Sequence, residues 1–216
     1  MKEIRAEEYF SIGFELGKKQ YWTIFFNFLI YTVLAVVASI TIVGLLIVPA
    51  LFLGLIKSML KAARGEKIEI GDSLSEGFQN GLWWKGLLFG IIYTAGVAIG
   101  FMLLIAPGLY LATVWLLGIY LLVDKGMLPT EALGKSRELV HELGFWKIFA
   151  VHIGISLVTQ IASFIPGLSL ALLFLLPFIM MIYIAIYENA IDNSLADSEQ
   201  EKLKEISEDA DFEDEI

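Results

Sequence analysis

The sequence predicts an all-α membrane protein, a polytopic bundle of six transmembrane helices arranged as three sequential hairpins. Three long runs contain no Lys, Arg, Asp or Glu: 37 residues at Gln20–Ile56, 38 at Gly86–Val123 and 40 at Ile148–Tyr187. One membrane-crossing helix needs only about 20 residues, so each run is long enough to cross the bilayer twice. A proline inside each run marks the expected turn of the hairpin, namely Pro49, Pro107 and Pro166.

Composition supports this class and divides the chain into two parts. Hydrophobic residues make up 57% of the chain and charged residues 18%, far from the balance of a soluble domain. The net charge of −9 belongs to residues 192–216, which hold 11 acidic residues and two lysines. We therefore expect an acidic tail at 192–216 that is disordered or forms a loose helix around 199–206. A single membrane domain is expected at 1–191, with hairpins at about 20–63, 84–123 and 146–188.

The positive charges predict which side of the membrane the connectors occupy. All 15 Lys and Arg lie in the N-terminal segment, in the connectors at 57–85 and 124–147, or in the tail. With an even number of spans, these segments fall on one side. Because positive charge favours the cytoplasmic side, we expect both termini in the cytoplasm.

The elements outside the three runs follow from their own residues. Residues 1–19 mix charged and apolar side chains, and they form either an amphipathic helix on the membrane surface or a solvated arm. Ser73 and Glu76 have capping-box spacing, which predicts a short interfacial helix in the first connector. Pro129 suits the first turn of a helix in the second connector. One face of that helix would carry four residues at helical spacing: Ala132, Ser136, Leu139 and Leu143.

The spans themselves follow from the prolines and the flanking aromatic residues. We expect the first hairpin to cross at about 21–44 and 49–63. In the second hairpin, span four runs from about 109 to 122, and in the third, span six begins after Pro166-Gly167 and ends near residue 188. Span three contains small residues four apart, at Gly86 and Gly90 and again at Gly96 and Gly100, which favours close helix packing.

Tryptophan positions indicate an internal repeat. Trp22, Trp84 and Trp146 are each 62 residues apart, and each opens one of the hairpins. Because every unit contains two spans, all three units enter the membrane from the same side. The sequence therefore indicates a parallel threefold repeat, unlike the inverted repeats of many transporters.

A set of short motifs in the second half of the chain resembles a known family. These motifs are Ala-Pro-Gly-Leu-Tyr-Leu at 106–111, Val-Asp-Lys-Gly at 123–126, Pro-Thr-Glu-Ala-Leu at 129–133, Ser136, and Gly-Phe-Trp-Lys-Ile-Phe at 144–149. Together they resemble a signature of bacterial and archaeal multi-pass membrane proteins that are similar to the membrane domain of some glycerophosphodiester phosphodiesterases. The resemblance covers about residues 80–190. It implies a helical membrane domain in the plasma membrane of a prokaryote, and it brings no catalytic residue with it.

The fifth span carries a polar stripe that is a candidate intramembrane site. At about 100° per residue, its polar side chains fall within an arc of about 100°. They are His152, Ser156, Thr159, Gln160 and Ser163, and Asn27 belongs to a weaker stripe on the first span. Such residues either line a site for a polar ligand group or hydrogen-bond between helices.

A basic cluster follows the second span and is a candidate contact for anionic lipids. It consists of Lys57, Lys61, Arg64 and Lys67. Each positive charge near an anionic membrane surface contributes about 1 kcal/mol of attraction. The simpler interpretation is that these residues only set the topology of the chain.

The sequence argues against several classes of function. It contains no cysteine and only two histidines, His141 and His152, which lie at different depths, and its spans contain no carboxylate. It has no Gly-rich phosphate loop, Ser-His-Asp set or HExxH motif, and nothing favours nucleic acid. We therefore expect no enzymatic activity, catalytic residue, metal or cofactor.

Two functions remain open. The first is a non-enzymatic membrane bundle that acts through membrane lipids or through a protein partner docked on the acidic tail. The alternative is a carrier or binding site for a lipid or small amphipathic molecule, with the stripe at His152 lining the cavity. The sequence leaves the oligomeric state open.

Overall fold

The computed structural model describes residues 4–214, and within them every regular element is a helix. Side chains are not described at 42, 43, 45, 166, 167, 169, 170 and 201–214. In chain order the elements are α1 Ala6–Lys19, α2 Tyr21–Ala38, α3 Ile42–Ala63, α4 Asp72–Glu76, η1 Gln79–Gly81, α5 Leu82–Leu103, α6 Ile105–Val114, α7 Gly118–Lys125, α8 Pro129–Glu142, α9 Phe145–Ser163 and α10 Pro166–Asp214.

Six helical stretches are long and apolar enough to cross a membrane, which confirms the predicted class of fold. They are Tyr21–Ala38, Leu46–Ala63, Gln79–Leu103, Ile105–Lys125, Phe145–Ser163 and Ala171–Gln200. They form three sequential hairpins, the first from α2 and α3, the second from α5 with α6 and α7, and the third from α9 and α10. The amino-acid pattern therefore predicted the number, order and pairing of these helices.

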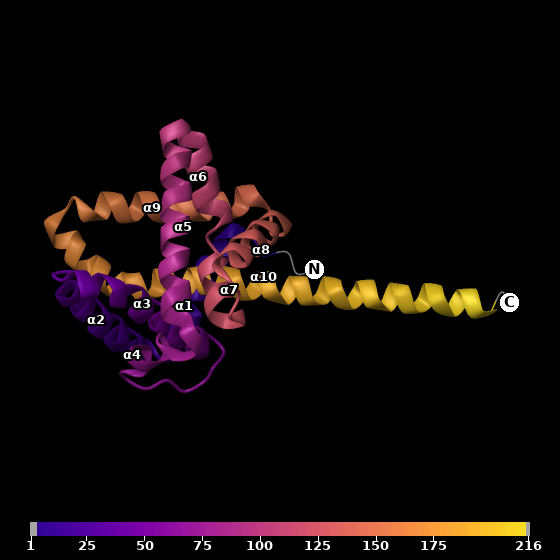
Figure 1. Ribbon diagram of the computed structural model, residues 1–216, viewed down its shortest axis with the longest axis horizontal. Coiled ribbons are helices and arrows are strands. Elements are labelled where there is room, and N and C mark those ends of the chain that lie inside the picture. The colour runs from indigo at the N-terminus through magenta and orange to yellow at the C-terminus, as the bar shows by residue number, and fades with distance from the viewer. Residues whose placement is uncertain (1–3, 215–216) are drawn as a thin grey trace.

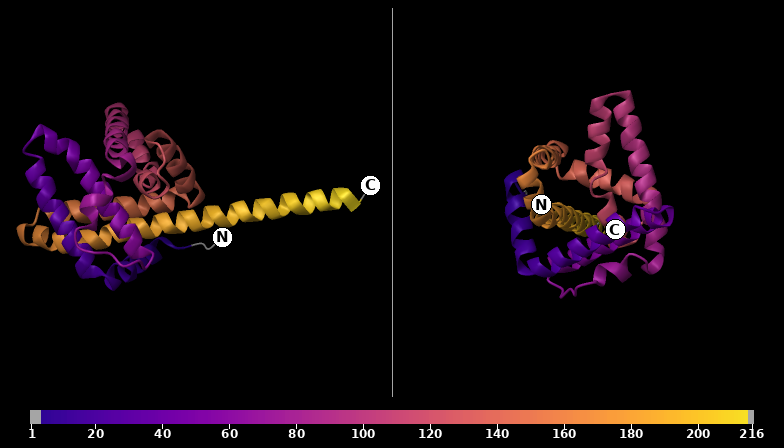
Figure 2. Two further views of the ribbon diagram at one scale, coloured as in Figure 1. Left: turned by 60° about the horizontal axis from the view of Figure 1, so that its bottom comes forward. Right: turned by 90° about the vertical axis from the view of Figure 1, so that its left-hand side faces the viewer.

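The three hairpins do not share one direction. Figure 1 shows α5 and α6 rising steeply across the line along which α9 and α10 run, and both views in Figure 2 agree. The middle hairpin packs the base of α5 on α3 and α8, and its α6 on α8 and α9. The repeat in the sequence is therefore not matched by a common direction of the hairpins.

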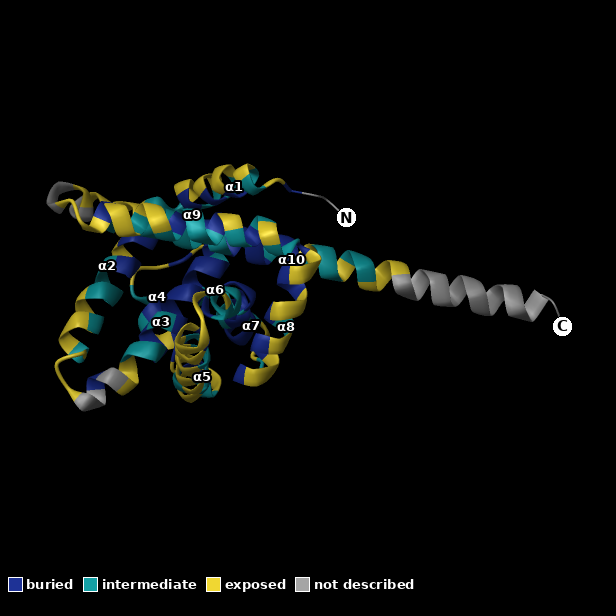
Figure 3. Cartoon of the chain, turned by 90° about the horizontal axis from the view of Figure 1, so that it is seen from above, coloured by how far each residue is buried: buried dark blue, intermediate teal, exposed yellow. Residues whose placement is uncertain are grey.

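The core lies where the bases of the hairpins meet, and the tips are exposed. Figure 3 shows the buried residues gathered around α3, α7 and α8. At the tips, Ile40, Met102 and Phe164 are 80%, 86% and 84% exposed. Apolar tips that stand clear of the protein suit helices surrounded by lipid. The fully buried large side chains include Leu53, Ile56, Met59, Leu117, Leu122, Leu139, Ile148 and Tyr187.

The prolines do not all mark the turns, which corrects one prediction. The tip of the first hairpin is at Ser39–Thr41, and Pro49 lies inside α3. Thr41 caps α3, because its side chain accepts a hydrogen bond from the backbone N–H of Gly44. A polar cap can end one helix and begin the next without proline. Pro107 lies in the first turn of α6, and of these three prolines Pro166 alone begins its helix.

The predicted fourth span is broken rather than continuous. α6 ends at Val114 and α7 begins at Gly118, with a turn at 115–117 between them. The helix predicted in the second connector is confirmed as α8, with Pro129 at its first position. Its four predicted face residues are all buried: Ala132, Ser136, Leu139 and Leu143.

The N-terminal helix packs on α10, which neither sequence interpretation included. Tyr9 and Gly13 are buried in this contact, and a Cβ on Gly13 would lie 2.7 Å from the Cα of Ile182. Phe14 stacks on Phe178 with ring centroids 5.0 Å apart. Because glycines let two helix backbones approach closely, α1 lies directly against α10.

The acidic tail was predicted to be disordered or to form a loose helix around 199–206, and in the structure α10 continues into it. α10 continues to Asp214, and Figure 1 shows its last part projecting beyond the other helices. Extending an existing helix adds one hydrogen bond per residue without a new nucleus, and six of the 25 residues at 192–216 are the helix former Glu. Residues 215–216 of the predicted tail lie outside the described residues.

Candidate functional site

A cleft of about 430 Å³ separates the first hairpin from the second. Its walls come from α2 and α3 on one side, and from α5, the turn at 115–117 and α7 on the other. We call it the aromatic cleft, because six of its lining residues are aromatic: Tyr31, Phe52, Phe89, Tyr93, Trp115 and Tyr120. The volume lies within the range of ligand pockets, about 300–1,000 Å³.

Aromatic pairs hold both walls of the cleft. Tyr31 and Phe52 have ring centroids 5.7 Å apart and join α2 to α3. Across the cleft, Tyr93 lies 6.0 Å from Phe89 and 6.2 Å from Trp115. These centroid separations are those of favourable aromatic pairs, so the rings support one another around the space.

Two glycines of α5 have opposite roles at the cleft. A Cβ on Gly86 would collide with the Leu53 side chain, so this glycine brings α5 against α3. A Cβ on Gly90, one turn later, would meet no atom within 4 Å, although Gly90 lines the cleft. The pair was predicted to mark close packing. The first glycine packs closely, and the second leaves space.

Ser136 supports the break in the wall formed by α6 and α7. Its hydroxyl donates to the carbonyl oxygen of Val114 at 2.7 Å and accepts from the N–H of Leu117 at 3.0 Å. Both backbone groups would otherwise lack a partner at the break, and buried unpaired groups are costly. The broken helix places Trp115 and Leu116 in the lining of the cleft.

Arg64 connects the ends of all three hairpins. Its Nη1 lies 2.6 Å from Oδ1 of Asp124 at the end of α7, and its Nε lies 2.9 Å from Oε1 of Glu188 in α10. The hydrogen bond to Asp124 raises the pKa of the Arg64 guanidinium, so Arg64 is a permanent cation. Asp124 also accepts from the hydroxyl of Tyr187 at 2.8 Å and pairs with Lys125 at 3.1 Å. We call these five residues the arginine cluster.

The aromatic cleft and the arginine cluster are in contact through two tyrosines. Tyr120 lines the cleft, and its ring stacks on Tyr187 with centroids 5.6 Å apart. Tyr187 in turn donates its hydroxyl to Asp124. The sequence alone did not single out this cluster, because its members are spread over residues 64–188.

The structure does not bring the predicted stripe of α9 together at one cavity. His152 Nδ1 lies 3.1 Å from the hydroxyl of Tyr183 on α10. The hydroxyls of Thr159 and Ser163 donate to backbone carbonyls of their own helix. A second apolar cleft of about 370 Å³ lies between α9, α10 and α1, and Thr159 alone of the stripe lines it. Ser156 is half-buried and Gln160 is exposed.

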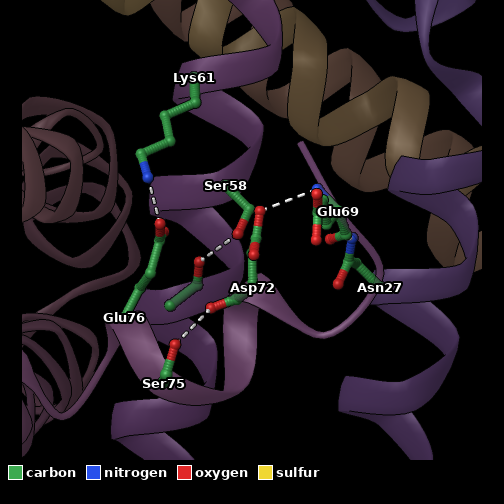
Figure 4. Close-up of polar contacts among 8 residues, drawn as sticks. Asn27, Ser58, Lys61, Glu69, Asp72, Ser75 and Glu76 are labelled. Atoms are coloured by element: carbon green, nitrogen blue, oxygen red, sulfur yellow. Dashed lines mark hydrogen bonds and ion pairs between the residues drawn. The ribbon is translucent and has the colours of Figure 1, made fainter. Parts of the chain in front are cut away.

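Asn27, the remaining member of that predicted site, holds the first connector. It is 1% exposed, and its Nδ2 donates to the carbonyl oxygen of Glu69 at 3.0 Å. Its Oδ1 accepts from the N–H of Gly71 at 2.8 Å and from the hydroxyl of Ser73 at 3.3 Å. In the same region, Figure 4 shows Lys61 paired with Glu76. This arrangement fastens the connector to α2 and α3.

The basic cluster predicted after the second span divides into two pairs. Lys61 and Arg64 form ion pairs with acidic residues of this chain. Lys57 and Lys67 form no ion pair with the described residues, and they are half-buried and exposed respectively. Within residues 4–200, no group of three or more His, Asp or Glu is placed to hold a metal ion.

Comparisons with protein-family models, with curated proteins and with solved structures found nothing that matches this chain. The resemblance of residues 80–190 to a family of membrane domains therefore stays a prediction.

Proposed function

We propose that this chain is a non-enzymatic membrane protein that binds an acyl chain of a membrane lipid in the aromatic cleft. The observation that supports the proposal is the cleft itself, about 430 Å³ in volume and walled by helices long and apolar enough to cross a membrane. A space between such helices is open to lipid rather than to water. An acyl chain is therefore the occupant that both the lining and the surroundings favour.

Two hydroxyl groups belong to tyrosines that line the cleft. Tyr31 and Tyr120 both line it, and their hydroxyls hydrogen-bond to none of the described residues. A tyrosine hydroxyl in an apolar setting usually finds an acceptor. The ester carbonyl of a phospholipid supplies one at the head of each acyl chain, so these hydroxyls fit a lipid ester.

Filling the cleft tests the proposal. The chain offers a matched pair of glycines, because a Cβ on either Gly90 or Gly154 meets no atom within 4 Å. Gly90 lines the aromatic cleft, whereas Gly154 lines the second apolar cleft. Gly90→Leu therefore fills the proposed site, and Gly154→Leu adds the same side chain elsewhere.

The measurement is photo-crosslinking to phosphatidylcholine with a diazirine on its acyl chain, in vesicles that contain the full chain. We expect labelled peptides from 86–93 and 115–120, at least about tenfold less label there in Gly90→Leu, and unchanged label in Gly154→Leu. Labelling of those peptides that survives Gly90→Leu would rule out the aromatic cleft as the binding site.

A second candidate function concerns the acidic end of α10. Residues 192–216 carry a net charge of −9, and Figure 1 shows the last part of α10 standing clear of the hairpins. An acidic helix of this kind fits a basic protein surface. Truncation after Gln200 is expected to remove crosslinked partners from intact membranes, and an unchanged set of partners would contradict docking on the tail.

A further inference from the structure

A polar cleft of about 360 Å³ lies between α1, α3 and α10, beside the arginine cluster. Its polar lining comes from Arg64 and from four residues of α10: Glu188, Asn189, Asp192 and Asn193. Ile12 and Leu16 of α1 form an apolar wall opposite them. The polar cleft shares no lining residue with the aromatic cleft, so it is a separate place in the fold.

The charges around the polar cleft favour a cation. Arg64 and Lys125 supply two positive charges, but both already pair with acidic residues. Asp124, Glu188 and Asp192 supply three negative charges, and Asp192 forms no ion pair with the described residues. Glu188 and Asp192 are one helical turn apart and line the same cleft, so a cation between them meets two carboxylates.

Two donors beside these acids suit a phosphate. Asn189 is only 8% exposed, and its Oδ1 accepts from the Tyr9 hydroxyl at 2.8 Å. Its Nδ2 has no partner among the described residues and is not enclosed, so this donor opens on the cleft. Arg64 uses Nε and Nη1 in its two ion pairs, which leaves the N–H groups of Nη2 for a further acceptor.

The residues that line the polar cleft indicate which type of cation it binds. A quaternary ammonium has no N–H group and is recognised by the faces of aromatic rings. No aromatic residue lines the polar cleft, whereas carboxylates do. The cleft therefore suits a primary ammonium, which donates three hydrogen bonds.

The position of the polar cleft along the helices indicates which molecule carries that ammonium. The apolar run of α10 ends at Tyr187 and that of α3 ends at Ile56, so Glu188, Asp192 and Arg64 lie at the level where headgroups meet the helices. A phosphate and a primary ammonium occur together in the headgroup of phosphatidylethanolamine. We propose that the polar cleft binds the headgroup of phosphatidylethanolamine, with the ammonium between Glu188 and Asp192 and the phosphate at Asn189 and Arg64.

Asp192→Asn is the variant that tests this proposal. Asp192 is exposed and forms no ion pair with the described residues, so its loss leaves the arginine cluster intact. Asp197→Asn is the matched control, because it removes the same charge from the same helix outside the cleft.

The experiment uses the full chain in nanodiscs of equal phosphatidylethanolamine and phosphatidylcholine, and native mass spectrometry of the lipid that stays bound. We expect wild type and Asp197→Asn to retain about ten times more phosphatidylethanolamine than phosphatidylcholine. A tenfold preference is about the contribution of one hydrogen bond between charged groups, which phosphatidylcholine cannot make. Asp192→Asn is expected to lose most of this preference. Gly90→Leu, which fills the aromatic cleft, is expected to keep the preference for phosphatidylethanolamine. A failure of the aromatic-cleft proposal and a failure of the polar-cleft proposal therefore give different results.

Two results would overturn the proposal. The first is equal retention of the two lipids by wild type, or a preference that survives Asp192→Asn. The second is displacement of the bound lipid by soluble glycerophosphoethanolamine at the same concentration, which would show that the cleft takes the free headgroup compound and not the membrane lipid.

Discussion

The guanidinium of Arg64 lies 2.6 Å from the carboxylate of Asp124, and these two residues lie at the ends of α3 and α7, the last helices of two different hairpins. The same guanidinium reaches Glu188 of the third hairpin at 2.9 Å. One cation therefore holds together three segments that are far apart in the chain. Because the Asp124 side chain is only 9% exposed, its charge depends on these partners.

Removal of Arg64 is expected to destabilise the folded bundle. Arg64→Ala leaves Asp124 and Glu188 without their shared partner, and hydrogen bonds to charged groups contribute about 1.5–3 kcal/mol each. Arg64 is 36% exposed, so solvent screening reduces the effect and we expect a loss of about 2 kcal/mol. The measurement is the free energy of unfolding in detergent, with Arg137→Ala on the exposed face of α8 as control.

A double-mutant cycle shows whether the loss comes from the ion pair itself. Asp124→Asn in the Arg64→Ala background is expected to restore part of the lost stability, because the buried charge is removed as well. Strictly additive effects of the two substitutions would contradict a direct pair.

Ser136→Ala is expected to destabilise the junction between α6 and α7. The substitution leaves the carbonyl of Val114 and the N–H of Leu117 unpaired in a buried place, which costs about 1–3 kcal/mol. Thermal unfolding in detergent measures the effect, together with the fluorescence of Trp115 at the break. Ser198→Ala is the control, since Ser198 is exposed and bonds only within its own helix. Equal stability of the two variants would count against this role of Ser136.

Docking of α1 is expected to weaken at alkaline pH. Burial raises the pKa of Tyr9 from 10.0 to about 12, so the docked state favours the neutral phenol. The contribution of Tyr9 is therefore complete below pH 10 and decreases between pH 10 and about 12. Ionisation also removes the proton that Tyr9 donates to Asn189.

A spin label on Ser11→Cys reports this docking, because Ser11 is exposed on α1 and the chain has no other cysteine. We expect label mobility to rise between pH 10 and about 12. In Tyr9→Phe, mobility is expected to stay constant over that range. The same rise in both variants would show that another group controls the docking.

Single cysteines at the hairpin tips test the topology. Ile40, Leu104 and Phe164 are 80%, 70% and 84% exposed, so each accepts a substitution to cysteine without disturbing the core. An impermeant thiol reagent applied outside intact cells is expected to label all three, and to label Ser198→Cys only after permeabilisation. Failure at Leu104 alone would mean that the steep middle hairpin of Figure 1 does not cross with the other two.

The sequence predicted the candidate sites less completely than it predicted the helices. The polar stripe at His152 is present on α9, but the hydroxyls of Thr159 and Ser163 donate to backbone carbonyls of the same helix. Periodicity shows which face a residue occupies and not what lies opposite. Asn27 illustrates the same limit, since its partners are backbone groups of a connector about 42 residues later.

Local patterns of the chain were enough to predict the six apolar helices, their pairing into hairpins and the position of α8, because charge-free length and helical spacing are local properties. The arginine cluster, the support of Val114 and Leu117 by Ser136, and the clefts between hairpins became visible only in the folded arrangement. These depend on which helices meet and in which direction they run. The free energy of such contacts is shared between distant residues, so no local pattern records it.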